Sequence, residues 1–224
     1  GGHVSQPPTA AQLDAGAGDG MTVAPEEQAR ADMYALLARM LHAAPDAQML
    51  ATLAGAEPIV AQSGHPLDRA WERLVTGAGV MDEHALADEF AALFFSVGTP
   101  KLNPYASLYM AGFINEKPLV ALRADLARLG LGRAPGQREM EDHLGALCEA
   151  MRLLVAGGPD RAARALALQQ QFFTTHIAPW YGRCLHDIRS APEANFYRLV
   201  ADFAQAFFDL EAEAFALDDA CEAA

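Results

Sequence analysis

The sequence predicts an all-α fold, a single bundle of roughly nine helices with a hinge near residue 130. Alanine and leucine number 47 and 27, whereas valine and isoleucine together number 13. Helix formers therefore far outnumber the β-branched residues that fill strands. The 224 residues are 52% hydrophobic and 20% charged, which suits one large globular domain or two halves that share a core.

Apolar residues at helical spacing indicate the first helices. Segment 25–42 has a proline and two acids in its first turn and one apolar face, formed by Met33, Leu36, Leu37, Met40 and Leu41. Weaker helical runs follow at 46–62 and 66–77, and a stronger one at 82–96. Segment 100–110 contains two prolines but also Tyr105, Leu108 and Tyr109, so we expect a loop that is partly packed.

Glycine and proline divide the second half of the chain. A helix at 115–130 ends at Gly130 and is followed by a Gly/Pro-rich connector, 131–137. A helix is expected over 138–155, then a long run over 160–188 that Pro179 kinks, then a last helix that opens with capping-box spacing from Ser190 to Glu193. We therefore expect two halves, 25–130 and 137–218, a flexible arm or cloning remnant at 1–24, and an acidic tail at 219–224.

Charge and cysteine content exclude several classes of protein. The net charge of −13 repels phosphate backbones, so nucleic-acid binding is not expected. No apolar stretch approaches the roughly 20 residues of a membrane span. The three cysteines form no CxxC pair, which favours a reducing compartment, and no basic and apolar export signal precedes Arg30. A cytoplasmic location is expected.

Three acidic or histidine side chains have spacing that suits a metal site. Glu139, Asp142 and His143 stand at i, i+3 and i+4, so one helical turn would project them to one side. No second Glu-x-x-His is present, which disfavours a di-metal bundle. Two interpretations remain: a helical metal-dependent enzyme, or acids that stabilise a helix N-terminus beside a half-buried histidine.

The C-terminal segment suggests a third interpretation. From Glu193 onward it carries eight acids against a single arginine, Arg198. This segment is either a solvated helix face or the interaction tail of a structural adaptor.

Three ordered motifs resemble those of the TorD/DmsD/NarJ family of molybdoenzyme-specific chaperones. They are Glu89-Phe90 leading to Leu93-Phe94, the run 104–109 of the form P-x-x-S-x-Y, and the run 139–143, which ends in Asp142-His143. The likeness extends over about 25–215 and includes an opening R-x-x-x-Y-x-L-L run from Arg30. Met140 stands where the family often has proline, which could loosen the turn that presents Asp142 and His143.

The resemblance implies a cytoplasmic chaperone without enzymatic activity, cofactor or metal. It would bind the twin-arginine leader peptide, or the apo-form, of a molybdenum oxidoreductase catalytic subunit and assist folding, cofactor insertion and export proofreading. The implied peptide-binding residues are Pro104, Tyr105, Ser107, Tyr109, Asp142 and His143, with Glu89, Phe94 and Glu139 in support. A receptor for such a leader needs carboxylates for two guanidinium groups and an apolar groove for the stretch that follows. We expect a monomer that can also form a domain-swapped homodimer through the connector near residue 130.

Overall fold

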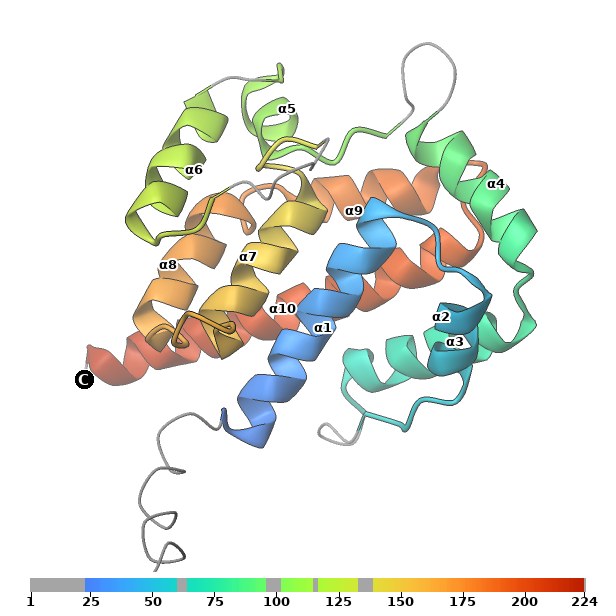
Figure 1. The fold of residues 1–224 in the computed structure, drawn as a ribbon, viewed down its shortest axis with the longest axis horizontal. Coiled ribbons are helices and arrows are strands. Elements are labelled where there is room, and N and C mark those ends of the chain that lie inside the picture. Colours follow the sequence, from blue (N-terminus) through green and yellow to red (C-terminus); the bar gives the residue numbers. More distant parts are fainter. Residues whose placement is uncertain (1–22, 60–63, 96–101, 115–116, 133–138, 224) are drawn as a thin grey trace, which may run out of the picture.

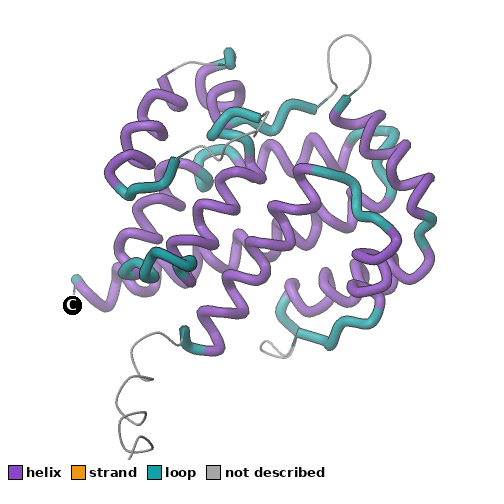
Figure 2. The backbone as a smooth tube through the Cα atoms, viewed as in Figure 1, coloured by secondary structure: helices purple, strands orange, loops and turns teal. Residues whose placement is uncertain are grey.

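The computed structural model describes residues 23–59, 64–95, 102–114, 117–132 and 139–223. This part of the chain folds into helices joined by loops and contains no strand, which confirms the all-α prediction (Figure 2). The ten helices are α1 (Pro25–His42), α2 (Ala47–Ala54), α3 (Pro66–Val80), α4 (Glu83–Phe94), α5 (Ala106–Ala111), α6 (Lys117–Arg128), α7 (Leu144–Ala156), α8 (Leu166–His176), α9 (Tyr181–Ser190) and α10 (Phe196–Glu222). None of them is long and apolar enough to cross a bilayer.

The centre of the bundle is formed by α1, α7 and α10. Helix α1 packs along α7, and the 27-residue α10 packs against α3 and α9 (Figure 1). The α1–α7 and α3–α10 contacts join the first half of the chain to the second, and the α9–α10 contact lies within the second half. All three enclose one core. The largest fully buried side chains of that core include Trp180, Tyr34, Tyr197 and Phe173. The aromatic residues of the last helices therefore serve mainly as core.

Helices α5 and α6 form a hairpin at one corner of the bundle (Figure 1). Two arginines in the loop after α7 hold the end of this hairpin, because Arg161 donates to the carbonyl of Gly130 and Arg164 donates to the carbonyl of Leu129. Gly130 has φ +69°, a left-handed conformation that ends α6 where the sequence predicted a stop. Most of the predicted connector, 133–137, lies outside the described residues.

Several predicted boundaries are wrong. The run 46–62 yields a helix that ends at Ala54, and the predicted loop 100–110 contains α5. The predicted helix at 138–155 begins only at Leu144. Around Pro179 the run 160–188 breaks into two helices, which is more than a kink. Ser190 ends α9 and does not cap the last helix, and α10 continues through 219–222 of the expected tail.

The N-terminus of α10 is capped by a residue far away in the sequence. Asn195 precedes the helix but makes no side-chain capping bond. The buried carboxylate of Glu89 on α4 instead accepts hydrogen bonds from the backbone N–H groups of Phe196 (3.0 Å) and Tyr197 (2.8 Å). A negative charge at this end of the helix also complements the helix dipole. Glu89 thus ties α4 to the longest helix of the bundle.

Candidate functional site

A short antiparallel contact brings two of the sequence motifs together. The N–H of Ala106 donates to the carbonyl of Asp142 (3.0 Å), and the N–H of Leu144 donates to the carbonyl of Pro104 (2.9 Å). Tyr105 and His143 face each other as a single β-bridge between these bonds. Proline suits position 104 because only its carbonyl is used. The backbone therefore fixes 104–107 against 140–144, which are about 35 residues apart in the sequence.

Asp142 caps α5 across this contact. Its Oδ2 accepts hydrogen bonds from the Ser107 N–H (2.8 Å) and the Ser107 hydroxyl (2.5 Å), and Tyr105, the residue before the helix, supplies no side-chain cap. Asp142 and Ser107 are both 0% exposed. The other oxygen, Oδ1, is buried and has no hydrogen-bond partner within the described part of the chain. In this conformation Asp142 positions the loop and is closed to an incoming side chain.

His143 performs a similar task for α7. Its Nδ1 accepts a hydrogen bond from the N–H of Gly145 (3.0 Å), so the ring proton of the neutral imidazole resides on Nε2. Burial, together with the nearby His42, lowers the pKa of His143 to about 3. The His42 ring stacks on His143 at 5.0 Å, and the Tyr105 ring meets His143 edge-on at 5.2 Å. His143 is thus a neutral, packed N-cap.

The predicted metal-binding turn is wrong in its geometry. Glu139, Asp142 and His143 precede α7 and do not share a helical turn. Glu139 is directed toward the His42 Nδ1 at 3.7 Å, while Asp142 is bonded to Ser107. Among the described residues no group of three or more His, Cys, Asp or Glu side chains is arranged to hold a metal ion.

Tyr109 connects the loop to α9. Its hydroxyl donates to the Asp187 carboxylate (2.5 Å), and its ring stacks on Trp180 at 5.4 Å. Arg183 donates to the Tyr109 carbonyl (2.8 Å) and places its guanidinium 5.8 Å from the ring centroid. Burial and the Asp187 hydrogen bond raise the pKa of Tyr109. The sequence analysis did not include Arg183 and Asp187 among the site residues. Their i, i+4 spacing, which places them on one face of a helix, was the local signal that could have indicated them.

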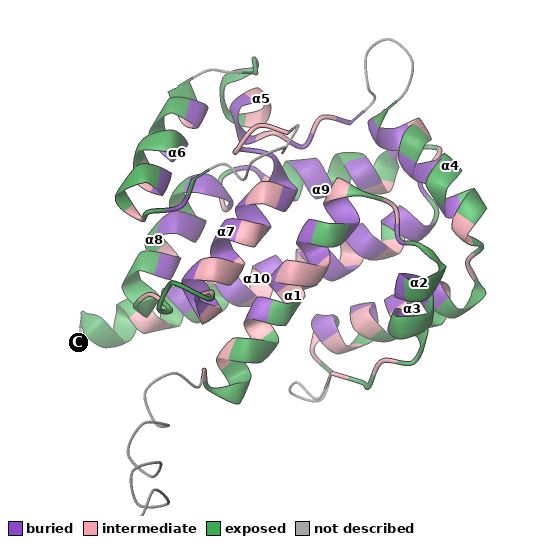
Figure 3. Cartoon of the chain, viewed as in Figure 1, coloured by how far each residue is buried: buried purple, intermediate pink, exposed green. Residues whose placement is uncertain are grey.

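Four apolar side chains at the end of α5, just after it and on α6 are exposed. They are Met110 (40% exposed), Phe113 (70%), Ile114 (41%) and Val120 (64%). Most of α6 is exposed, whereas α5 is mainly buried or half-buried (Figure 3). Large exposed apolar side chains are candidates for an interaction site. By contrast, Phe94 is buried against Phe90 and Tyr197 and contributes to the core.

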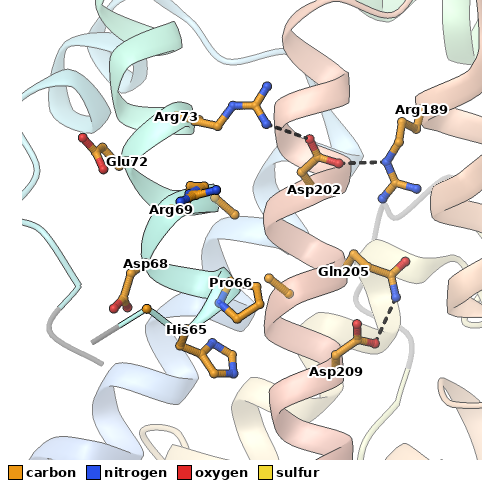
Figure 4. Close-up of a pocket in the computed structure, with 13 residues that line it drawn as sticks. His65, Pro66, Asp68, Arg69, Glu72, Arg73, Arg189, Asp202, Gln205 and Asp209 are labelled. Atoms are coloured by element: carbon orange, nitrogen blue, oxygen red, sulfur yellow. Dashed lines mark hydrogen bonds and ion pairs between the residues drawn. The ribbon is translucent and has the colours of Figure 1, made fainter. Parts of the chain in front are cut away.

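A cleft of about 620 Å³ is lined by residues of α3, α9 and α10. Asp202 lies between two arginines there, at 3.7 Å from Arg73 and 2.8 Å from Arg189 (Figure 4). Asp209 accepts hydrogen bonds from Tyr181 and Gln205. Several acids of the C-terminal segment are thus engaged by neighbouring side chains of the bundle.

One of these acids belongs to a buried network. Glu211 is 3% exposed and binds Arg30 through both oxygens while accepting a hydrogen bond from Tyr34. The arginine and the tyrosine of the opening R-x-x-x-Y run therefore have a structural role, because both bind Glu211.

The fold has a solved counterpart. The crystal structure of a provisionally assigned redox enzyme maturation protein from Archaeoglobus fulgidus aligns with a TM-score of 0.52 at 16% identity, covering 81% of this chain and 92% of that one. At this identity the likeness shows the fold. The two proteins thus share a helical fold.

Sequence comparison identifies the family. Residues 61–186, more than half of the chain, match the family described as nitrate reductase delta subunit, so the chain belongs to this NarJ/TorD-type family. A curated relative, the chaperone protein TorD of Shewanella loihica, is 26% identical over 208 residues, which cover 85% of this chain and 94% of the relative.

Proposed function

We propose that the chain is a cytoplasmic chaperone for a molybdenum oxidoreductase. It binds the twin-arginine leader peptide or the apo-form of the catalytic subunit, and it assists folding, cofactor insertion and export proofreading. Membership of the family and the likeness to a protein named as a chaperone support this proposal. The observation that carries it is the set of exposed apolar side chains on the α5–α6 hairpin, which begins within the 104–109 motif.

The residues of the proposed site divide into two roles. Pro104, Ser107, Asp142 and His143 are buried and hold the loop in place. Tyr105 and Tyr109 are half-exposed and offer aromatic surface to a ligand. The apolar stretch of the leader would lie on the hairpin, and the net charge of −13 attracts the cationic end of the leader. The chaperone itself makes and breaks no bond in this mechanism.

Titration of the full chain with a synthetic twin-arginine leader tests the proposal. Phe113→Ser should weaken binding about tenfold or more, since burying such a side chain contributes about 1.5–3 kcal/mol. Val80→Ser is the matched control, because Val80 is 82% exposed but lies at the end of α3. Absence of leader binding by the unmodified chain, or equal affinity of both variants, would contradict the proposed site.

Elemental analysis tests the non-enzymatic role. Protein purified without chelators should carry no stoichiometric metal. A full equivalent of iron, manganese or zinc would favour the metal-dependent enzyme instead.

The proposal includes a monomer that can exchange halves with a second copy. The packing of α1 on α7 and of α3 on α10 joins the two halves within one chain, and the same contacts can form between chains if the segment near residue 130 opens. Light scattering across a concentration series, before and after mild acid exposure, should show monomer and dimer. A single species under all conditions would contradict the exchange.

A further inference from the structure

Asp187 on α9 is a solvent-accessible carboxylate beside the 104–109 loop. Its side chain is exposed, and its Oδ2 lies 2.5 Å from the Tyr109 hydroxyl. Asp142, which the motif comparison singles out, is 0% exposed and bonded to Ser107. Glu141 has a side chain that is only 13% exposed and is paired with Arg123. Of these three carboxylates, that of Asp187 is the one most open to a cationic ligand.

The surroundings of Asp187 suit a guanidinium group. An arginine is recognised by a carboxylate that can accept two parallel hydrogen bonds and by the face of an aromatic ring. Tyr109 supplies such a ring next to the carboxylate, and Trp180 stacks on that ring. The protein already places one guanidinium here, that of Arg183, 5.8 Å from the Tyr109 ring centroid. Arg183 is exposed, and an arginine of the ligand would take its place over the ring.

Apolar surface continues from the same place. Met110 follows Tyr109 in α5, and Phe113 lies just beyond the end of that helix, 70% exposed. A ligand with a cationic end and an adjoining apolar stretch could place the first on Asp187 and Tyr109 and the second on Met110 and Phe113. The twin-arginine leader of the proposed function has this chemistry.

We propose that Asp187 is a specificity-determining residue of the peptide site, where its carboxylate pairs with an arginine of the leader beside the Tyr109 ring. Asp142 is then a positioning residue that holds α5 and the loop. This assignment rests on the proposed function, because it requires that the chain binds a leader peptide.

A double-mutant cycle with the full chain tests the assignment. Asp187→Asn removes the charge while its amide oxygen can still accept the hydrogen bond from Tyr109. Asp219→Asn is the control, because it makes the same change of net charge at an exposed position near the end of α10. Both variants and the unmodified chain are titrated with a twin-arginine leader and with a leader whose two arginines are replaced by glutamine. Thermal melts confirm that each variant is folded.

The expected result is a loss of affinity of about tenfold for Asp187→Asn with the arginine leader, and less than twofold with the glutamine leader. Asp219→Asn should stay within twofold of the unmodified chain. If Asp187→Asn binds the arginine leader normally, or loses equal affinity for both leaders, the assignment of Asp187 is overturned while leader binding stands. If the unmodified chain binds neither leader, the proposed function fails together with it.

Discussion

Replacing Glu89 should reveal how strongly the fold depends on one buried carboxylate. Glu89→Ala leaves the buried N–H groups of Phe196 and Tyr197 without their acceptor. Each of the two unsatisfied donors costs about 1–3 kcal/mol, so we expect the free energy of unfolding to fall by about 2–6 kcal/mol. At about 2–4 °C per kcal/mol for a domain of this size, the melting temperature should fall by about 10 °C.

Urea and thermal unfolding followed by circular dichroism would measure this loss. Asp88→Ala is the matched control, since Asp88 is the exposed neighbour of Glu89 on α4 and removes the same charge. Glu89→Gln keeps one acceptor and should lose about half as much stability as Glu89→Ala. If Glu89→Ala unfolds within about 0.5 kcal/mol of Asp88→Ala, the capping of α10 by this carboxylate contributes little and the reasoning is refuted.

Three further predictions concern the loop and the start of α7. Asp142→Asn should lower the free energy of unfolding by about 1–3 kcal/mol in urea titrations, because a charge-assisted pair of bonds to Ser107 is weakened; unchanged stability would contradict this. The pKa of His143 is about 3 in the folded protein and near 6.5 in the unfolded chain. As the pH falls, the unfolded state therefore binds a proton before the folded state does. The free energy of unfolding should then fall by at most about 1.4 kcal/mol per pH unit between about pH 6.5 and 3. His143→Asn keeps an N-cap acceptor and should flatten this slope in unfolding curves measured across the same pH range. An unchanged slope would show that His143 is not its source. Gly145→Ala would place a Cβ 2.9 Å from the His42 Nε2 and should destabilise by about 1–3 kcal/mol, with part of the loss recovered in a His42→Ala background; equal losses in both backgrounds would exclude this clash.

The sequence predicted elements whose signals are local. Helix 25–42 was predicted with its correct bounds, because its proline, first-turn acids and apolar face all belong to one segment. The stop after α6 was also predicted, since the left-handed Gly130 ends it. The start of α7 was predicted too early, because 139–143 have helical spacing while the chain is held to the 104–107 loop by backbone hydrogen bonds from across the fold.

The roles of the motif residues depended on tertiary contacts. Glu89 and Asp142 each cap a helix that lies 107 or 35 residues away in the sequence, and no local pattern indicates such a partner. The spacing of Glu139, Asp142 and His143 suggested a metal-binding turn, but the polar atoms of Asp142 and His143 serve helix ends instead. Asp187 lies outside every motif and is joined to Tyr109 by a contact that spans 78 residues.

Capture of the chain from its native cells tests most directly the proposal that it is a maturation chaperone. The tagged protein is purified during expression of molybdenum oxidoreductases, and its partners are identified by mass spectrometry and assayed for molybdenum. We predict enrichment of one catalytic subunit, from the formate dehydrogenase, TMAO/DMSO reductase or nitrate reductase classes, with its leader uncleaved and its cofactor absent. Recovery of no such subunit, or of only the cofactor-loaded mature enzyme, would contradict a role as a maturation chaperone.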